Sequence, residues 1–77
     1  MKAYKSSSGK QSGVISYELG DNFIKVEFVE GSIYQYTYDS AGSLIIEKMK
    51  SLALLGKGLS TFISKQRPNY DHIIYWP

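Results

Sequence analysis

The segment from Lys48 to Arg67 contains five cations and no acid. Such a segment can neutralise successive phosphates of a nucleic acid. The same charges are also typical of a solvated surface, because cations near the carboxyl ends of helices complement the helix dipole. The segment therefore indicates either a phosphate-binding surface or an ordinary polar face. Its cations are Lys48, Lys50, Lys57, Lys65 and Arg67.

Three tyrosines at alternate positions, Tyr34, Tyr36 and Tyr38, form a second set of candidate functional side chains. Alternate residues of a strand lie on one face of a sheet. Exposed rings on such a face can stack on unpaired bases. Alternate aromatic residues also pack well into a core. We favour core packing here, because of the turn that precedes the tyrosines.

The residue sets that thiol, metal or acid–base chemistry needs are missing from the sequence. The chain has no cysteine and one histidine, His72, so no pair of such ligands can hold a metal. Asp71 precedes His72, but neighbours on a strand point to opposite faces. The other carboxylates are explained by turns, helix caps and polar faces, and none forms an acid–base couple. We predict a protein that is not an enzyme, without metal, cofactor or small-molecule substrate.

The residues from Phe23 to Tyr38 predict a β-hairpin, and its turn decides where the tyrosines point. A two-residue loop would place Phe28 opposite Ile33 and the tyrosines on the outer face, but it needs positive φ at Glu30. A three-residue loop with a bulge at Gly31 needs positive φ only at the glycine. It turns the first two tyrosines inward. We favour this loop, which leaves a polar outer face of Lys25, Glu27, Gln35 and Thr37.

Helical periodicity follows the hairpin. Asp39 and Ser40 can cap a helix that extends to Leu55. Its apolar residues span an arc of roughly 200°, which predicts a wide buried face with Leu54 alone on the polar side. Gly56 can end the helix in the left-handed conformation. The predicted buried face comprises Leu44, Ile45, Ile46, Met49, Leu52, Ala53 and Leu55.

A second, shorter helix fits Leu59 to Gln66, and Pro68 stops it. Val14 to Leu19 alternates like a strand. The sequence therefore predicts an α+β domain, with a three-stranded antiparallel meander and one long and one short helix packed on one face. The short aromatic segment at the end of the chain could add a fourth strand.

Composition divides the chain into three parts. Residues 1–12 are polar and serine-rich, which predicts a mobile arm. Residues 13–70 form one small domain, and residues 71–77 form an aromatic tail. The first residues lack the apolar core of a signal peptide, and the absence of cysteine agrees with a reducing compartment. We therefore expect a cytoplasmic protein, and a net charge of +2 does not by itself indicate nucleic acid.

From the hairpin onward, short motifs follow one another in a fixed order. They are Phe28-x-x-Gly31-x-x-Tyr34-x-Tyr36, Ser40-Ala41-Gly42, Met49-Lys50-x-Leu52-Ala53-x-x-Gly56-x-Gly58-Leu59, Phe62-Ile63 and Tyr70. This order resembles the KTSC domain, a short bacterial module appended to some lysyl-tRNA synthetases and also found as a stand-alone protein. The resemblance covers about Val14 to Tyr70, and its hallmark is the central YxY. The tail from Asp71 onward departs from the family pattern.

The resemblance implies a non-catalytic domain, for which RNA binding has been suggested because of the synthetase association. With the acid-free segment, it predicts a tRNA-related RNA-binding accessory module that uses the five cations together with Tyr34 and Tyr36. The alternative is a module for protein interaction or self-association through a strand edge and the apolar tail. Its contacts would be Leu54, Tyr75 and Trp76. We expect RNA or protein as the partner, and no membrane.

Overall fold

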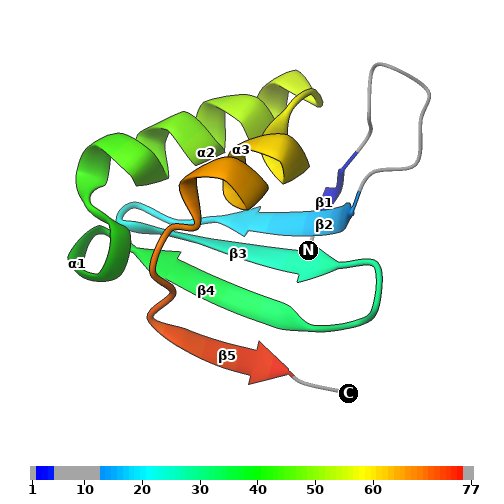
Figure 1. Ribbon diagram of the computed structural model, residues 1–77, viewed down its shortest axis with the longest axis horizontal. Coiled ribbons are helices and arrows are strands. Elements are labelled where there is room, and N and C mark those ends of the chain that lie inside the picture. The colour runs from blue at the N-terminus through cyan, green and yellow to red at the C-terminus, as the bar shows by residue number, and fades with distance from the viewer. Residues whose placement is uncertain (1, 5–12, 76–77) are drawn as a thin grey trace.

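The structure is a computed structural model that describes residues 2–4 and 13–75. Within these residues, an antiparallel sheet in the order β1-β2-β3-β4-β5 carries the two longer helices on one face (Figure 1). The strands are β1 (Lys2–Ala3), β2 (Val14–Leu19), β3 (Phe23–Phe28), β4 (Ile33–Thr37) and β5 (His72–Tyr75). The helices are α1 (Tyr38–Ala41), α2 (Ser43–Leu55) and α3 (Leu59–Gln66). The predicted α+β class, the meander and the additional C-terminal strand are confirmed, and β5 pairs with β4.

The turn between β3 and β4 is the predicted three-residue loop. The Phe28 N–H donates to the Ser32 carbonyl oxygen at 2.8 Å, and the Gly31 N–H donates to the Phe28 carbonyl oxygen at 2.8 Å. Residues 29–31 therefore form the loop. Gly31 has a φ of 104°, a value that glycine adopts without steric cost.

The register of the hairpin follows from this loop. Ile24 lies opposite Tyr36, and Val26 lies opposite Tyr34, so the two tyrosines point toward the helices, as predicted. Lys25 lies opposite Gln35 on the outer face. Polar side chains on that face pair with one another. Lys25 Nζ lies 3.5 Å from Glu18 Oε2, and the Ser16 hydroxyl donates to Glu27 Oε1 at 2.6 Å.

Gly31→Ala is expected to lower the free energy of unfolding by about 1 to 2 kcal/mol, because an L-residue pays a steric penalty at positive φ. Equilibrium unfolding in urea measures the change. Val29→Ala is the matched control, because Val29 lies in the same loop with an exposed side chain. Equal stability of the two variants would contradict the bulged turn.

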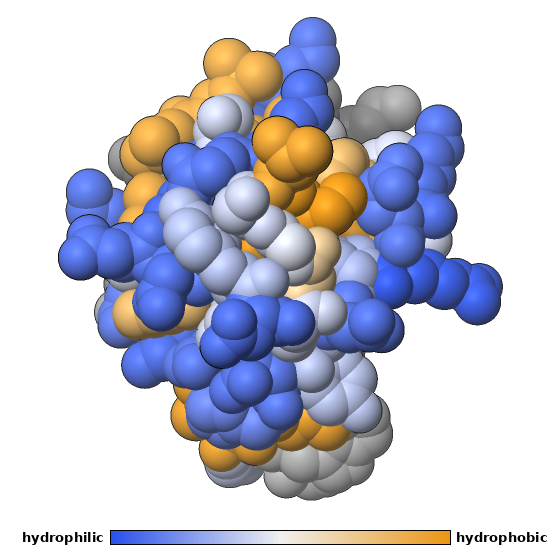
Figure 2. Space-filling view, turned by 90° about the vertical axis from the view of Figure 1, so that its left-hand side faces the viewer, coloured by the Kyte–Doolittle hydropathy of each residue, from blue (hydrophilic) through white to orange (hydrophobic). Residues whose placement is uncertain are grey.

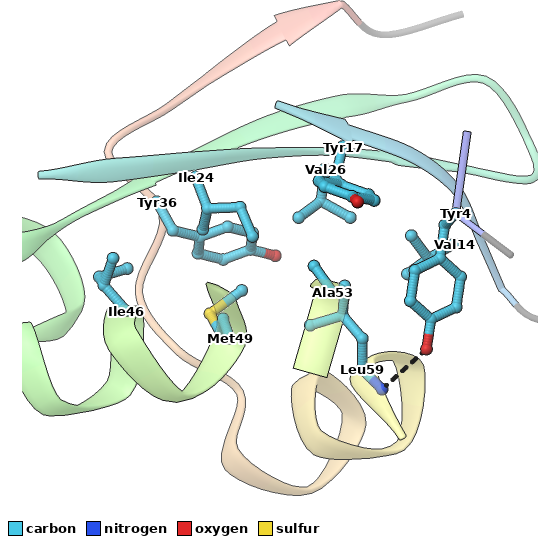
Figure 3. Close-up of a cluster of buried hydrophobic side chains, with 10 residues drawn as sticks. All are labelled: Tyr4, Val14, Tyr17, Ile24, Val26, Tyr36, Ile46, Met49, Ala53 and Leu59. Atoms are coloured by element: carbon cyan, nitrogen blue, oxygen red, sulfur yellow. Dashed lines mark hydrogen bonds between the residues drawn. The ribbon is translucent and has the colours of Figure 1, made fainter. Parts of the chain in front are cut away.

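The core lies between the sheet and the two longer helices (Figure 3). Tyr36 has 4% of its surface exposed, and Ile24 and Val26 are fully buried. The strands and the segments beside them contribute Tyr4, Val14, Tyr17, Ile24, Val26 and Tyr36, and the helices contribute Ile46, Met49, Ala53 and Leu59.

The start of the chain differs from the predicted mobile arm. Lys2 and Ala3 pair with β2, and Tyr4 is buried. The Tyr4 N–H donates to the Ile15 carbonyl oxygen at 2.9 Å, and its hydroxyl accepts from the Leu59 N–H at 3.3 Å (Figure 3). Two contacts fix the position of Tyr4. Its ring packs in the core, and its hydroxyl accepts a hydrogen bond from the Leu59 N–H, a backbone donor at the start of α3. Residues 5–12 of the predicted arm lie outside the described residues.

The structure has two helices, α1 and α2, where the sequence predicts one helix that extends to Leu55. Thr37, not Asp39 or Ser40, caps α1: its side chain accepts from the Ser40 N–H, and its own N–H donates to the Ser40 hydroxyl. Gly42 then has a φ of 90°, which is not helical, and α2 begins at Ser43. The sequence pattern could not show this break, because the polar residues on both sides of it suit a helix start.

The buried face of α2 is narrower than predicted. Ile46, Met49 and Ala53 are its buried residues. They lie roughly 140° to 180° around the helix from Leu44, which is 87% exposed. Leu55 lies on the same side as Leu44 and is also exposed, so the prediction was wrong for both.

The end of α2 and all of α3 agree with the prediction. Gly56 is left-handed, with a φ of 74°, and its N–H donates to the Leu52 carbonyl oxygen at 2.9 Å.

Strand β2 departs from the regular alternation that the sequence predicts. A register shift between Val14 and Ser16 places Val14 in the core and exposes Ile15. No helix within the described ranges is long and apolar enough to cross a membrane.

Candidate functional site

A hollow of about 420 Å³ lies where the end of α3 and the segment before β5 meet the β3–β4 hairpin. We call it the Tyr34 hollow. It brings the two tyrosines of the YxY motif, Tyr34 and Tyr36, together with Arg67, the last cation of the acid-free segment. The sequence analysis treats the tyrosines and the cations as separate candidates. Its lining residues are Phe28, Glu30, Tyr34, Tyr36, Ile63, Arg67, Pro68, Asn69 and Tyr70.

Tyr34 lies at the centre of an aromatic cluster. Its ring meets Phe28 edge to face, with centroids 5.5 Å apart, and Tyr70 edge to face at 5.0 Å. It stacks on Tyr36 at 6.3 Å with an interplanar angle of 16°. Tyr34 is half-buried, whereas 49% of Tyr70 is exposed. The hollow therefore has one fixed aromatic wall and one aromatic side chain open to solvent.

Burial sets the acid–base properties of this cluster. It raises the pKa of Tyr36 to about 12, with further contributions from Tyr34 and Tyr70. Burial is also the largest cause of a raised pKa at Tyr34, followed by Tyr70 and Glu30. Both hydroxyls therefore stay protonated well above neutral pH and offer neutral hydrogen-bonding groups rather than charge.

Arg67 lies at the mouth of the hollow in an unusual backbone conformation. Its φ is 45°, and it is the one non-glycine residue with positive φ in the described part of the chain. It caps α3, with its N–H donating to the Ile63 carbonyl oxygen at 2.9 Å. A left-handed conformation costs a non-glycine residue about 1 to 2 kcal/mol, and such strain is often found at functional sites. Its side chain is exposed, as is that of Lys65 in the last turn of α3.

Lys50 makes structural contacts instead. Its Nζ donates to the Asp21 carbonyl oxygen at 2.8 Å, lies 2.9 Å from Glu47 Oε2 and sits over the Tyr38 ring, 5.6 Å from the centroid. The Tyr38 hydroxyl donates to Glu47 at 2.5 Å. This hydrogen bond is the main cause of a raised pKa at Tyr38 and a lowered pKa at Glu47. The network ties α1 and α2 to the turn before β3.

The remaining candidates are dispersed over the surface. Lys48 and Leu54 are exposed on α2. Lys57 precedes α3 and Arg67 follows it, so about 12 Å of helix separates the two. The cations therefore do not form one continuous row. Tyr75 is exposed on β5, and Trp76 lies outside the described residues.

His72 has a closer neighbour than predicted. Its Nδ1 lies 2.8 Å from Asp71 Oδ2, and both side chains are exposed. The prediction that their side chains diverge was wrong, because Asp71 lies before the first residue of β5 and is free of strand alternation. Among the residues that the structure describes, no group of three or more histidines and carboxylates could hold a metal ion.

A second hollow of about 450 Å³ is lined by Lys2, Tyr17, Glu18 and Leu19. Its aromatic residue, Tyr17, is buried and presents no open ring, and Lys2 and Glu18 carry opposite charges. The Tyr34 hollow is the better candidate because it combines an exposed ring with an exposed cation.

Sequence reasoning did not propose Asn69 or Tyr70 as site residues. The available signal was the Pro68-Asn69-Tyr70 run directly after the last cation, which links a helix stop to an aromatic residue.

Comparison of the chain with models of known families, with curated proteins and with solved structures finds no match.

Proposed function

We propose that this protein is a KTSC-like, non-catalytic domain that binds single-stranded RNA, with one unpaired base seated in the Tyr34 hollow. The observation that supports the proposal is the meeting of an exposed aromatic ring, Tyr70, with an exposed cation, Arg67, around the half-buried Tyr34. Aromatic rings beside cations are the usual means of holding unpaired bases and their phosphates.

The lining of the hollow suits a base better than an isolated phosphate. Tyr70 offers a surface on which any base can stack. The Asn69 side-chain amide can both donate and accept hydrogen bonds, and the Glu30 carboxylate, which accepts from the Ser32 hydroxyl, can accept from a base N–H. A carboxylate at the site disfavours a free phosphate inside the hollow.

The phosphates of the strand would lie outside the hollow, beside Arg67 and Lys65. Tyr36 lines the hollow but offers little surface to a base, because its ring is buried. Lys50 does not belong to the interface, because its ammonium group serves the network of α1 and α2. The interface is therefore smaller than the residue set that the sequence indicates, and we expect a weak salt dependence.

Binding of a fluorescent single-stranded RNA, measured by anisotropy over a salt series, tests the proposal. Tyr70→Ala should lower the affinity about 5- to 150-fold, since stacking contributes about 1 to 3 kcal/mol per base. Arg67→Gly should also weaken binding and reduce the slope of log K against log salt by about 0.7. Its folding stability should not fall, because glycine relieves the strain at positive φ.

Tyr75→Ala is the control, because it removes another exposed ring that does not line the hollow. It should bind like the unaltered chain, and duplex RNA should bind more weakly than single-stranded RNA. Unchanged affinity in Tyr70→Ala, or binding that is independent of salt, would rule out the proposed interface.

A further inference from the structure

The two edges of the described sheet are protected very differently. β1 is two residues long and carries Lys2, and both features hinder pairing with another strand. β5 is four residues long, and each of its side chains is exposed. Its sequence, His72-Ile73-Ile74-Tyr75, contains no lysine, carboxylate or proline. β5 is therefore an apolar edge whose one protective feature is the register shift against β4 between Ile33 and Tyr34, which leaves Ile74 as an extra residue.

The surroundings of β5 leave space for a neighbour. Figure 1 shows β5 at the margin of the sheet, away from α2 and α3. Figure 2 shows hydrophobic surface over β5 at the bottom of the molecule, separated by hydrophilic residues from the apolar surface of the helices. Exposed apolar area on an open strand edge is typical of a surface that pairs with another chain.

We propose that β5 pairs with β5 of a second copy of this chain, antiparallel and around a two-fold axis perpendicular to the sheet. Such an axis keeps each side chain on its own face, so a residue must lie opposite itself or a residue two positions away. Tyr75 lies opposite Ile33 and Ile73 opposite Tyr34, so Tyr75 and Ile73 are on different faces and cannot pair with each other. The pairing is therefore centred on Ile73, which lies opposite Ile73 of the second copy. The result is one continuous sheet across two domains.

Charge also favours a second copy as the occupant. With Ile73 on the axis no like charges lie opposite each other within β5, because His72 is its only basic side chain. Branched aliphatic residues pack well as cross-strand pairs. A small domain also gains stability from association, since its single core is limited.

Sedimentation of the unaltered chain from about 1 μM to about 1 mM, the range for a small interface, tests the proposal. The mass should rise with concentration from 8.7 kDa toward twice that value. Ile74→Lys should raise the dissociation constant at least about tenfold, because two lysines would meet near the axis. Leu44→Lys, an equal change at an exposed site on α2, should dimerise normally.

Cysteine cross-linking tests the same pairing of β5 with β5 even if Ile74→Lys destabilises the β5 strand. The chain has no cysteine, so Ile73→Cys and Ile74→Cys each introduce one thiol. Under mild oxidation, Ile73→Cys, whose residue lies on the axis, should form a disulfide dimer faster than Ile74→Cys and Leu44→Cys. The proposal is overturned by a chain that stays monomeric, by cross-linking no faster than in Leu44→Cys, or by an edge that binds only a different protein.

Discussion

Tyr4→Ala is expected to leave a large part of the protein unfolded under native conditions. Removing a buried aromatic side chain costs about 3 to 5 kcal/mol, and a domain of this size has a total stability of about 3 to 5 kcal/mol. Tyr4 is buried in the core and its ring meets that of Tyr17 edge to face at 6.4 Å. Urea unfolding followed by circular dichroism measures the loss.

Tyr4→Phe separates the ring from its hydroxyl. The phenylalanine keeps the packing but leaves the Leu59 N–H without its acceptor, which costs about 1 to 3 kcal/mol for a buried donor. The order of stability should therefore be the unaltered chain, then Tyr4→Phe, then Tyr4→Ala. If Tyr4→Ala unfolds at the same urea concentration as the unaltered chain, the first residues do not belong to the folded domain.

The folded protein is expected to lose about 2 to 3 kcal/mol of stability as the pH rises from about 10 to about 12. Burial raises the pKa of Tyr36 from 10.0 to about 12, so the folded state holds this proton after the unfolded chain has released it. The unfolded state then binds fewer protons, and stability falls with rising pH. Below about pH 10 both states keep the proton, and this contribution to stability is complete.

Tyr36→Phe is the control for this pH dependence. It keeps the ring in the core and removes the titrating hydroxyl, so its stability should decline less between pH 10 and 12 than that of the unaltered chain. All other side chains are the same in both proteins, so their contributions cancel in the comparison. Parallel pH profiles, obtained from urea unfolding at each pH, would contradict the burial of Tyr36.

Local chemistry made much of the fold predictable. The hairpin could be assigned because one glycine, Gly31, relieves the strain of a three-residue loop and fixes the register of both strands. The same holds for Gly56, which ends α2, and for Pro68, which follows the end of α3. Each of these decisions depends on residues that are close together in the chain.

Contacts between distant residues made the rest unpredictable. Tyr4 is buried because α3 offers it a partner that is far away in the sequence. Leu44 faces solvent because the break at Gly42 and the packing of α2 on the sheet set the rotation of the helix. The Tyr34 hollow likewise forms only when the end of α3 folds back over the hairpin, so no local pattern could join Tyr34 to Arg67.

The motif order from Phe28 to Tyr70 consists largely of residues that build the fold. Gly31 makes the turn, Tyr36, Met49 and Leu59 are buried, and Gly56 caps a helix. Lining residues such as Arg67 and Asn69 lie outside the motifs. These motifs therefore specify structure for the most part, and the proposed RNA site combines motif residues such as Tyr34 and Tyr70 with side chains outside the motifs.

The most direct test of the proposed function is a map of where RNA binds. Backbone amide chemical shifts of the isotope-labelled chain should be followed during titration with a short single-stranded RNA. The largest changes are expected at residues 28–34 and 63–70, around the Tyr34 hollow. Changes confined to the outer face of α2 or to the outer face of the sheet, with the hollow unaffected, would contradict the proposed function.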